Sequence, residues 1–142
     1  MSRIRTYREF TRPFTLLAPH VGFWAGGLAA AGADGLPLTA ERFVPLLLGA
    51  LMAATLNVAS NGVNQIYDLS IDAVNKPTRP LPSGRMTLGE AWGVTVTFYA
   101  LSLLLAWLAS PPEGGREWFY IVLAAAFLTF LMLRGVSPSS ER

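Results

Sequence analysis

The fold is decided by an uncharged stretch, FVPLLLGALMAATLNVASNGVNQIY (Phe43–Tyr67), which runs directly into the polar segment DLSIDAVNKPTRPLPSGR (Asp68–Arg85). A helix of about 20 apolar residues, rising about 1.5 Å per residue, is long enough to cross the hydrocarbon core of a bilayer. The stretch therefore predicts a membrane-spanning helix. Its second half already contains asparagine, serine and glutamine, so the helix is expected to have a polar end.

Three further uncharged stretches flank this one: Pro13–Ala33, Ala91–Pro112 and Trp118–Leu133. The first two have spanning length. The last is shorter, but Glu117 and Arg134 bound it and its aromatic residues suit a membrane interface. A buried soluble helix is the alternative interpretation of this last stretch. We predict an all-α integral membrane helical bundle with about four transmembrane helices.

The composition supports a membrane protein and excludes several other classes. Of the 142 residues, 52% are hydrophobic and only 14% are charged, whereas soluble domains have about 25% charged residues. A net charge of +2 without a basic stripe does not fit a nucleic-acid partner. The absence of cysteine excludes thiolate catalysis and cysteine-based metal sites. We divide the chain into an N-terminal segment (1–12), a transmembrane domain (13–134) and a polar tail (135–142).

The positive charges predict the orientation of the bundle, because cytoplasmic segments are enriched in Lys and Arg. The two alternate connections contain only Arg42 and Arg116. The other segments contain nine cations: Arg3, Arg5, Arg8, Arg12, Lys76, Arg79, Arg85, Arg134 and Arg142. We therefore expect a multi-pass protein of the cell inner membrane, with both termini and residues 68–90 in the cytoplasm.

Several local patterns predict how the helices begin and pack. Thr6–Glu9 and Thr87–Glu90 both read as capping boxes at helix N-termini. Gly22 and Gly26, with Gly27 beside them, form a small-residue pair that favours close helix packing. A cleavable signal peptide is the alternative interpretation of the N-terminus, but its apolar stretch is longer than the ~7–15 residues of a signal sequence.

Polar residues of the second span and its extension share one face of a helix. At about 100° per residue they fall within roughly 80° of arc. They are Asn57, Asn61, Asn64, Asp68, Asp72 and Asn75. Polar side chains in a membrane helix are costly and normally face a cavity or one another. The pattern predicts that this helix lines a wet cavity.

The two carboxylates of this polar face indicate a cation. Asp68 and Asp72 lie one turn apart, which is unfavourable for like charges. They also lie near a helix C-terminus, limited by Pro77, where the helix dipole disfavours anions. Amide and carboxylate oxygens select a hard cation such as Mg²⁺, which is commonly held by one or two carboxylates together with substrate phosphates.

The following segment, NKPTRPLPSGR (Asn75–Arg85), supplies groups that bind phosphate. Its part Lys76–Arg85, the basic loop, is stiffened by three prolines and contains Lys76, Arg79 and Arg85. Arginine can bind phosphate oxygens with two parallel hydrogen bonds, and lysine acts as a point charge. The alternative is that these cations follow the positive-inside rule and that the aspartates balance them. The acidic pair and the basic loop together favour polyphosphate binding.

These residues resemble a known family. NQIYDLSID (Asn64–Asp72) is similar to the N-x-x-x-D-x-x-x-D motif of the UbiA-type intramembrane prenyltransferases, and RPLPSGR (Arg79–Arg85) resembles the loop that follows it. Arg12–Pro13 and the glycine-rich first span also resemble the start of that family. The resemblance covers about residues 10–110, the N-terminal half of such an enzyme.

The resemblance implies a Mg²⁺-dependent transferase that moves a prenyl group from a prenyl diphosphate to a lipophilic acceptor in the membrane: an aromatic ring, a tetrapyrrole or a lipid. It implies that Asn64, Asp68 and Asp72 form the catalytic metal site. The diphosphate would be bound by Lys76, Arg79, Arg85 and Asn61. The expected partners are thus prenyl diphosphate, the acceptor and membrane lipid.

The family fold implied by the resemblance has nine transmembrane helices in two halves, with a second aspartate-rich motif in the later half. We therefore expect further spans and a D-x-x-x-D-like motif to be encoded beyond Arg142. A second metal would stabilise the charge that develops on the leaving diphosphate, so the chain alone is not expected to turn over. A non-catalytic truncated membrane protein and a small four-helix transporter subunit are the alternatives.

The predicted orientation can be tested by cysteine labelling. Single cysteines introduced near Gly84 and near Gly114 should differ in their accessibility to a membrane-impermeant reagent, because the two positions lie on opposite sides of the bilayer in the four-span topology. Equal labelling of both positions from outside would contradict this topology.

Overall fold

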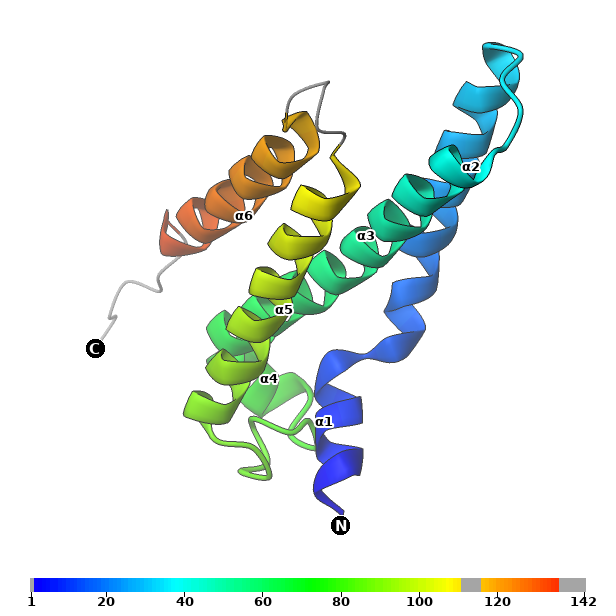
Figure 1. Cartoon of the computed structure of the whole chain (residues 1–142). Helices are drawn as coiled ribbons and strands as arrows, with labels where there is room; N and C mark the ends of the chain where they lie inside the picture. Colours follow the sequence, from blue (N-terminus) through cyan, green and yellow to red (C-terminus); the bar gives the residue numbers. More distant parts are fainter. Residues whose placement is uncertain (1, 111–115, 136–142) are drawn as a thin grey trace.

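The computed structural model describes residues 2–110 and 116–135, all of them in helices or the connections between helices (Figure 1). The elements in chain order are α1 (Arg3–Thr11), the 3₁₀ helix η1 (Pro13–Leu16), α2 (Leu17–Ala33), α3 (Ala40–Tyr67), α4 (Leu69–Asn75), α5 (Leu88–Ala109) and α6 (Glu117–Gly135). The predicted all-α class is confirmed. Residues 136–142 of the expected polar tail lie outside the described part of the chain.

The long helices have the length and composition of membrane spans. Within the described residues, three helical segments are long and apolar enough to cross a bilayer: Arg3–Ala33, Ala40–Tyr67 and Leu88–Ala109. The fourth expected span corresponds to α6, whose apolar part, Phe119–Thr129, is shorter. The chain is therefore an all-α membrane bundle, with η1 and α2 together covering the first expected span.

Helix α3 is the centre of the bundle. It packs against α2 and α5, and α6 packs mainly on α5 (Figure 1). The contact between α3 and α5 is close at Gly62, where a Cβ atom would lie 2.3 Å from Thr95 Oγ1. Thr95 is 1% exposed, and its hydroxyl donates to Ala91 O at 2.8 Å. A residue without a side chain is thus required at position 62.

The packing between α2 and α3 differs from the expectation for the first span. A Cβ atom on Gly22 or Gly26 would meet nothing within 4 Å, so the prediction that this pair makes the close helix contact is wrong. The adjacent Gly27 makes that contact instead, since its Cβ would lie 2.1 Å from Leu46 Cδ2 on α3. Gly22 and Gly26 line an apolar cavity of about 470 Å³ between the helices.

Helix α1 begins earlier than the capping pattern predicts. Ser2 is the N-cap, and its hydroxyl accepts from Arg5 N at 3.4 Å. Thr6 lies inside the helix and is buried, so the expected capping box at Thr6–Glu9 is wrong. The side chain of Glu9 is paired with Arg5, whose Nε donates to Glu9 Oε1 at 2.9 Å, and with a residue of the basic loop described below.

Helix α1 is also held against the ends of α3 and α5. Phe10, 1% exposed, packs in a cluster with Ile66, Leu81, Met86 and Ala91. The amide of Gln65 donates to Phe10 O at 2.9 Å, which satisfies a carbonyl at the end of α1. Leu81 of the basic loop therefore belongs to the same cluster that joins α1 to the ends of α3 and α5.

The N-terminus of α5 confirms the second capping box. Glu90 N donates to Thr87 Oγ1 at 3.2 Å, and Thr87 N donates to Glu90 Oε2 at 2.8 Å. The other oxygen of Glu90 accepts from Arg3 Nη2 at 2.6 Å, which ties α1 to α5.

A pair of glycine substitutions tests the packing of α3 on α5. Gly62→Ala should destabilise the protein by about 1–3 kcal/mol, because the added methyl overlaps the buried Thr95 side chain. Gly93→Ala in α5 is the matched control: its Cβ meets nothing within 4 Å, so it should be neutral or stabilise the helix by about 0.5–1 kcal/mol. Thermal unfolding in one detergent compares the two. Equal midpoints would contradict the packing described.

Candidate functional site

The polar face predicted on one helix is divided over two helices. Helix α3 ends at Tyr67 and α4 begins at Leu69, with Asp68 between them. The backbone hydrogen bonds nevertheless continue across the break, because Asp68 N donates to Asn64 O at 2.8 Å and Asp72 N donates to Asp68 O at 2.7 Å. Asn64, Asp68 and Asp72 therefore keep their one-turn spacing along the chain.

The members of this face differ in their exposure. Asn64 and Asp68 are exposed, whereas Asp72 is only 3% exposed. The prediction that all six polar residues face one wet cavity is wrong for Asp72, because the basic loop folds back over α4 and covers its carboxylate. Periodicity along a helix gives the direction of a side chain but not what later folds against it.

The buried Asp72 carboxylate is balanced by two cations of the basic loop. Arg79 Nη1 donates to Asp72 Oδ2, and Lys76 Nζ lies 3.7 Å from Asp72 Oδ1. The Arg79 side chain is 23% exposed and that of Lys76 is 54% exposed. Because a buried charge without a partner is strongly unfavourable, these ion pairs explain the conformation of the loop. The charge-balance alternative describes this arrangement, and the metal-ligand role of Asp72 stays a prediction.

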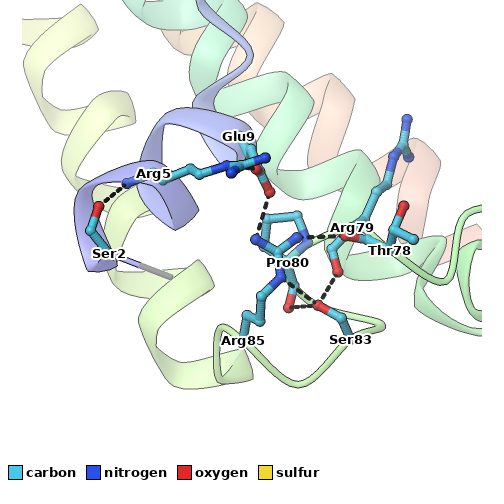
Figure 2. Close-up of polar contacts among 8 residues, drawn as sticks. All are labelled: Ser2, Arg5, Glu9, Thr78, Arg79, Pro80, Ser83 and Arg85. Atoms are coloured by element: carbon cyan, nitrogen blue, oxygen red, sulfur yellow. Dashed lines mark hydrogen bonds and ion pairs between the residues drawn. The ribbon is translucent and has the colours of Figure 1, made fainter.

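Arg85 lies between the basic loop and α1 (Figure 2). Its Nε donates to Ser83 Oγ at 3.0 Å and its Nη2 donates to Thr78 O at 2.5 Å. Its Nη1 lies 2.6 Å from Glu9 Oε2. The guanidinium group thus holds both ends of the loop together and attaches them to α1, a contact that no local sequence pattern indicated. Its predicted role in diphosphate binding stays a prediction.

The turn before Arg85 is closed by the loop's own polar groups. Ser83 Oγ donates to Arg79 O at 2.6 Å, and Gly84 N donates to Leu81 O at 3.0 Å. Gly84 has φ of +70°, a backbone conformation that residues with a side chain rarely adopt. In Figure 2 the Arg79 side chain extends away from this turn, on the other side from Arg85 and Glu9.

Asn61 belongs to a polar cluster between α3 and the start of the first span. Its Nδ2 donates to Asn57 Oδ1 at 2.9 Å and to Thr15 Oγ1 at 3.0 Å. Thr15 is the residue that the sequence patterns missed, although a hydroxyl in an otherwise apolar span is a signal for such a contact. Both amide hydrogens of Asn61 are used here, so its role toward a diphosphate also stays a prediction.

The exposed amide and carboxylate oxygens suit a magnesium site whose remaining ligands come from water and substrate phosphates. Asn64 and Asp68 offer an amide oxygen and a carboxylate, the ligand types of Mg²⁺. In residues 2–110 and 116–135, no three His, Cys, Asp or Glu side chains gather closely enough to form a metal cage. Mg²⁺ usually keeps several waters and is held by one or two carboxylates with substrate phosphates. The residues present therefore fit an open site of this kind.

The fold and this site define a class: a helical membrane bundle with oxygen donors at one helix end and a proline-stiffened basic loop beside them. Residues 16–138 match the UbiA prenyltransferase family. Since this match covers most of the chain, the chain belongs to that family.

Three curated relatives illustrate the similarity. The chain is 32% identical over 108 residues, 75% of its length, to homogentisate phytyltransferase of Synechocystis sp.. It is 36% identical over 130 residues, 86% of its length, to protoheme IX farnesyltransferase of Synechococcus elongatus. It is 30% identical over 129 residues, 90% of its length, to digeranylgeranylglyceryl phosphate synthase of Thermococcus kodakarensis.

The chain spans 35%, 39% and 42% of the length of these three relatives, respectively. No solved structure matches it.

Substitutions at the two cations test the balance of the Asp72 charge. Arg79→Leu should destabilise the protein by about 3 kcal/mol, because it leaves a buried carboxylate without its closest partner. Lys76→Leu should cost less than about 1 kcal/mol, since this longer and more exposed pair is weak. Adding Asp72→Asn to Arg79→Leu should recover most of the loss. Thermal unfolding checks all three, and equal effects of Arg79→Leu and Lys76→Leu would contradict the assignment.

Proposed function

We propose that the chain forms the prenyl-diphosphate-binding part of an intramembrane prenyltransferase, which transfers the prenyl group to a lipophilic acceptor. The observation that supports this most directly is the exposure of Asn64 and Asp68 at the polar end of a long apolar helix, beside the basic loop. Family membership supports the same reaction class. In the orientation expected from the positive charges, this site would face the cytoplasm.

Asn64 and Asp68 would hold Mg²⁺, together with Asp72 where that carboxylate exchanges Arg79 for the metal. Bound Mg²⁺ would supply positive charge to the diphosphate as the allylic C–O bond breaks. Lys76, whose side chain is half exposed, would add charge at the leaving group. Arg79 would do the same once released from Asp72, and Arg85 would fix the loop that presents both cations.

The apolar helices suit the other half of the substrate. An isoprenoid tail is stable against the apolar faces of α2, α3 and α5, and these faces would keep water from the carbocation that forms when diphosphate leaves. The Asn57–Asn61–Thr15 cluster would then mark the border between the polar site and the apolar region.

The relatives have a prenyl group in common but not an acceptor. The names of the relatives share a prenyl group (phytyl, farnesyl, geranylgeranyl), but differ in the acceptor: homogentisate, protoheme IX or a glyceryl phosphate. We therefore propose a prenyl diphosphate donor and leave the acceptor at the level of a lipophilic molecule. Membership of a transferase family gives no support to the four-helix transporter alternative.

A matched pair of asparagine substitutions tests the metal site. With the chain in lipid nanodiscs, calorimetry should detect Mg²⁺-dependent binding of a non-hydrolysable prenyl thiodiphosphate. Asp68→Asn should weaken this binding at least about tenfold, because it removes a charged metal ligand. Asp34→Asn, the same change at an exposed carboxylate after α2, should leave it unchanged. Unchanged Mg²⁺-dependent affinity in Asp68→Asn would favour a charge-balance role without metal.

A further inference from the structure

A cavity of about 950 Å³ lies between α1, the start of η1 and the basic loop. Figure 2 shows part of its wall, where Glu9 and Arg5 of α1 face Arg85 and Pro80 of the loop. Its lining contains five arginines and one carboxylate: Arg5, Arg8, Arg12, Arg79, Arg85 and Glu9. None of Asn64, Asp68, Asp72 and Lys76 lines it, so the proposed metal ligands lie outside the cavity. Arg79 and Arg85 are the two residues that it shares with the predicted diphosphate site.

The charge of this cavity is not balanced by the protein. Glu9 forms ion pairs with Arg5 and Arg85, and Arg79 forms an ion pair with Asp72. Among the described residues, Arg8 and Arg12 have no carboxylate partner within ion-pair distance. Guanidinium groups gathered in a recess attract phosphate, which they can bind with two parallel hydrogen bonds.

The rim of the cavity is apolar and continues into the first membrane helix. Pro13 and Phe14 line the cavity. Phe14 is 73% exposed and Leu17, the first residue of α2, is 67% exposed. The Arg12 guanidinium carbon lies 5.4 Å from the centre of the Phe14 ring, so charge and apolar surface meet at one point. A molecule that fits both surfaces has an anionic head and an apolar tail.

We propose that this cavity binds the headgroup of an anionic membrane phospholipid, with the phosphate at Arg8 and Arg12 and the acyl chains along Phe14 and Leu17. Basic pockets at the membrane surface commonly recognise anionic lipid headgroups. The bound lipid would neutralise part of the charge around Glu9 and Arg85, and so stabilise the contact between α1 and the basic loop.

Lipid titration of the purified chain tests the proposal. In detergent, phosphatidylglycerol should bind and raise the unfolding temperature, and phosphatidylcholine should have a much smaller effect. Arg8→Gln and Arg12→Gln should each weaken phosphatidylglycerol binding roughly tenfold, as expected for the loss of a hydrogen bond between charged groups. Arg42→Gln is the matched control, since Arg42 is exposed near the N-terminus of α3, outside the cavity. Native mass spectrometry counts the lipids bound to each variant.

Two further measurements distinguish a lipid headgroup from free phosphate and from the prenyl diphosphate site. Inorganic phosphate alone should not reproduce the stabilisation, because it has no apolar tail to contact Phe14. Phosphatidylglycerol binding should be independent of Mg²⁺ and unchanged in Asp68→Asn. Equal effects of the two lipids, equal losses in Arg8→Gln and Arg42→Gln, stabilisation by inorganic phosphate alone, or dependence on Mg²⁺ and Asp68 would each overturn the proposal. Arg8→Gln decides the outcome if Arg12→Gln does not fold, since Arg8 is exposed on α1.

Discussion

The burial of the Asp72 carboxylate is the constraint on which the polar end of this bundle depends. A buried carboxylate needs a close cation, and the nearest donor in the structure is Arg79 of the basic loop. The loop must therefore fold back over α4. Once folded back, it presents Arg85 to Glu9 and Leu81 to the cluster around Phe10. In this way one charge pair links α4, the basic loop and α1.

This arrangement separates two kinds of polar residue in the proposed site. Asp72 and Arg79 form an ion pair that holds the basic loop against α4, whereas Asn64 and Asp68 remain exposed. In a polar site of this kind, some of the protein's charged side chains pair with one another when no substrate is bound. A highly charged substrate could then bind by replacing these internal pairs. If Mg²⁺ replaced Arg79 at Asp72 while Arg79 moved to the diphosphate, the number of charge pairs would be conserved, and the exchange would have little net electrostatic cost.

The helices were predictable from the sequence because their apolar length is a local property. The uncharged stretches correspond to η1–α2, α3, α5 and α6, and the Thr87–Glu90 capping box marks the start of α5. The exposure of the polar residues was not predictable. Asp72 is covered by a loop whose path depends on Arg79, and α1 starts at a cap, Ser2, that competes with the pattern at Thr6. Such contacts between separate segments leave no periodic pattern in the sequence.

We propose that Asn64 and Asp68 bind the metal that accompanies a prenyl diphosphate. Anomalous scattering from crystals containing the chain, Mn²⁺ in place of Mg²⁺ and a prenyl thiodiphosphate tests it most directly. We expect an anomalous peak at the junction of α3 and α4, within about 2–2.5 Å of an Asp68 carboxylate oxygen. A thiodiphosphate bound among Arg5, Arg8 and Arg12, with no metal peak near Asp68, would contradict this metal site.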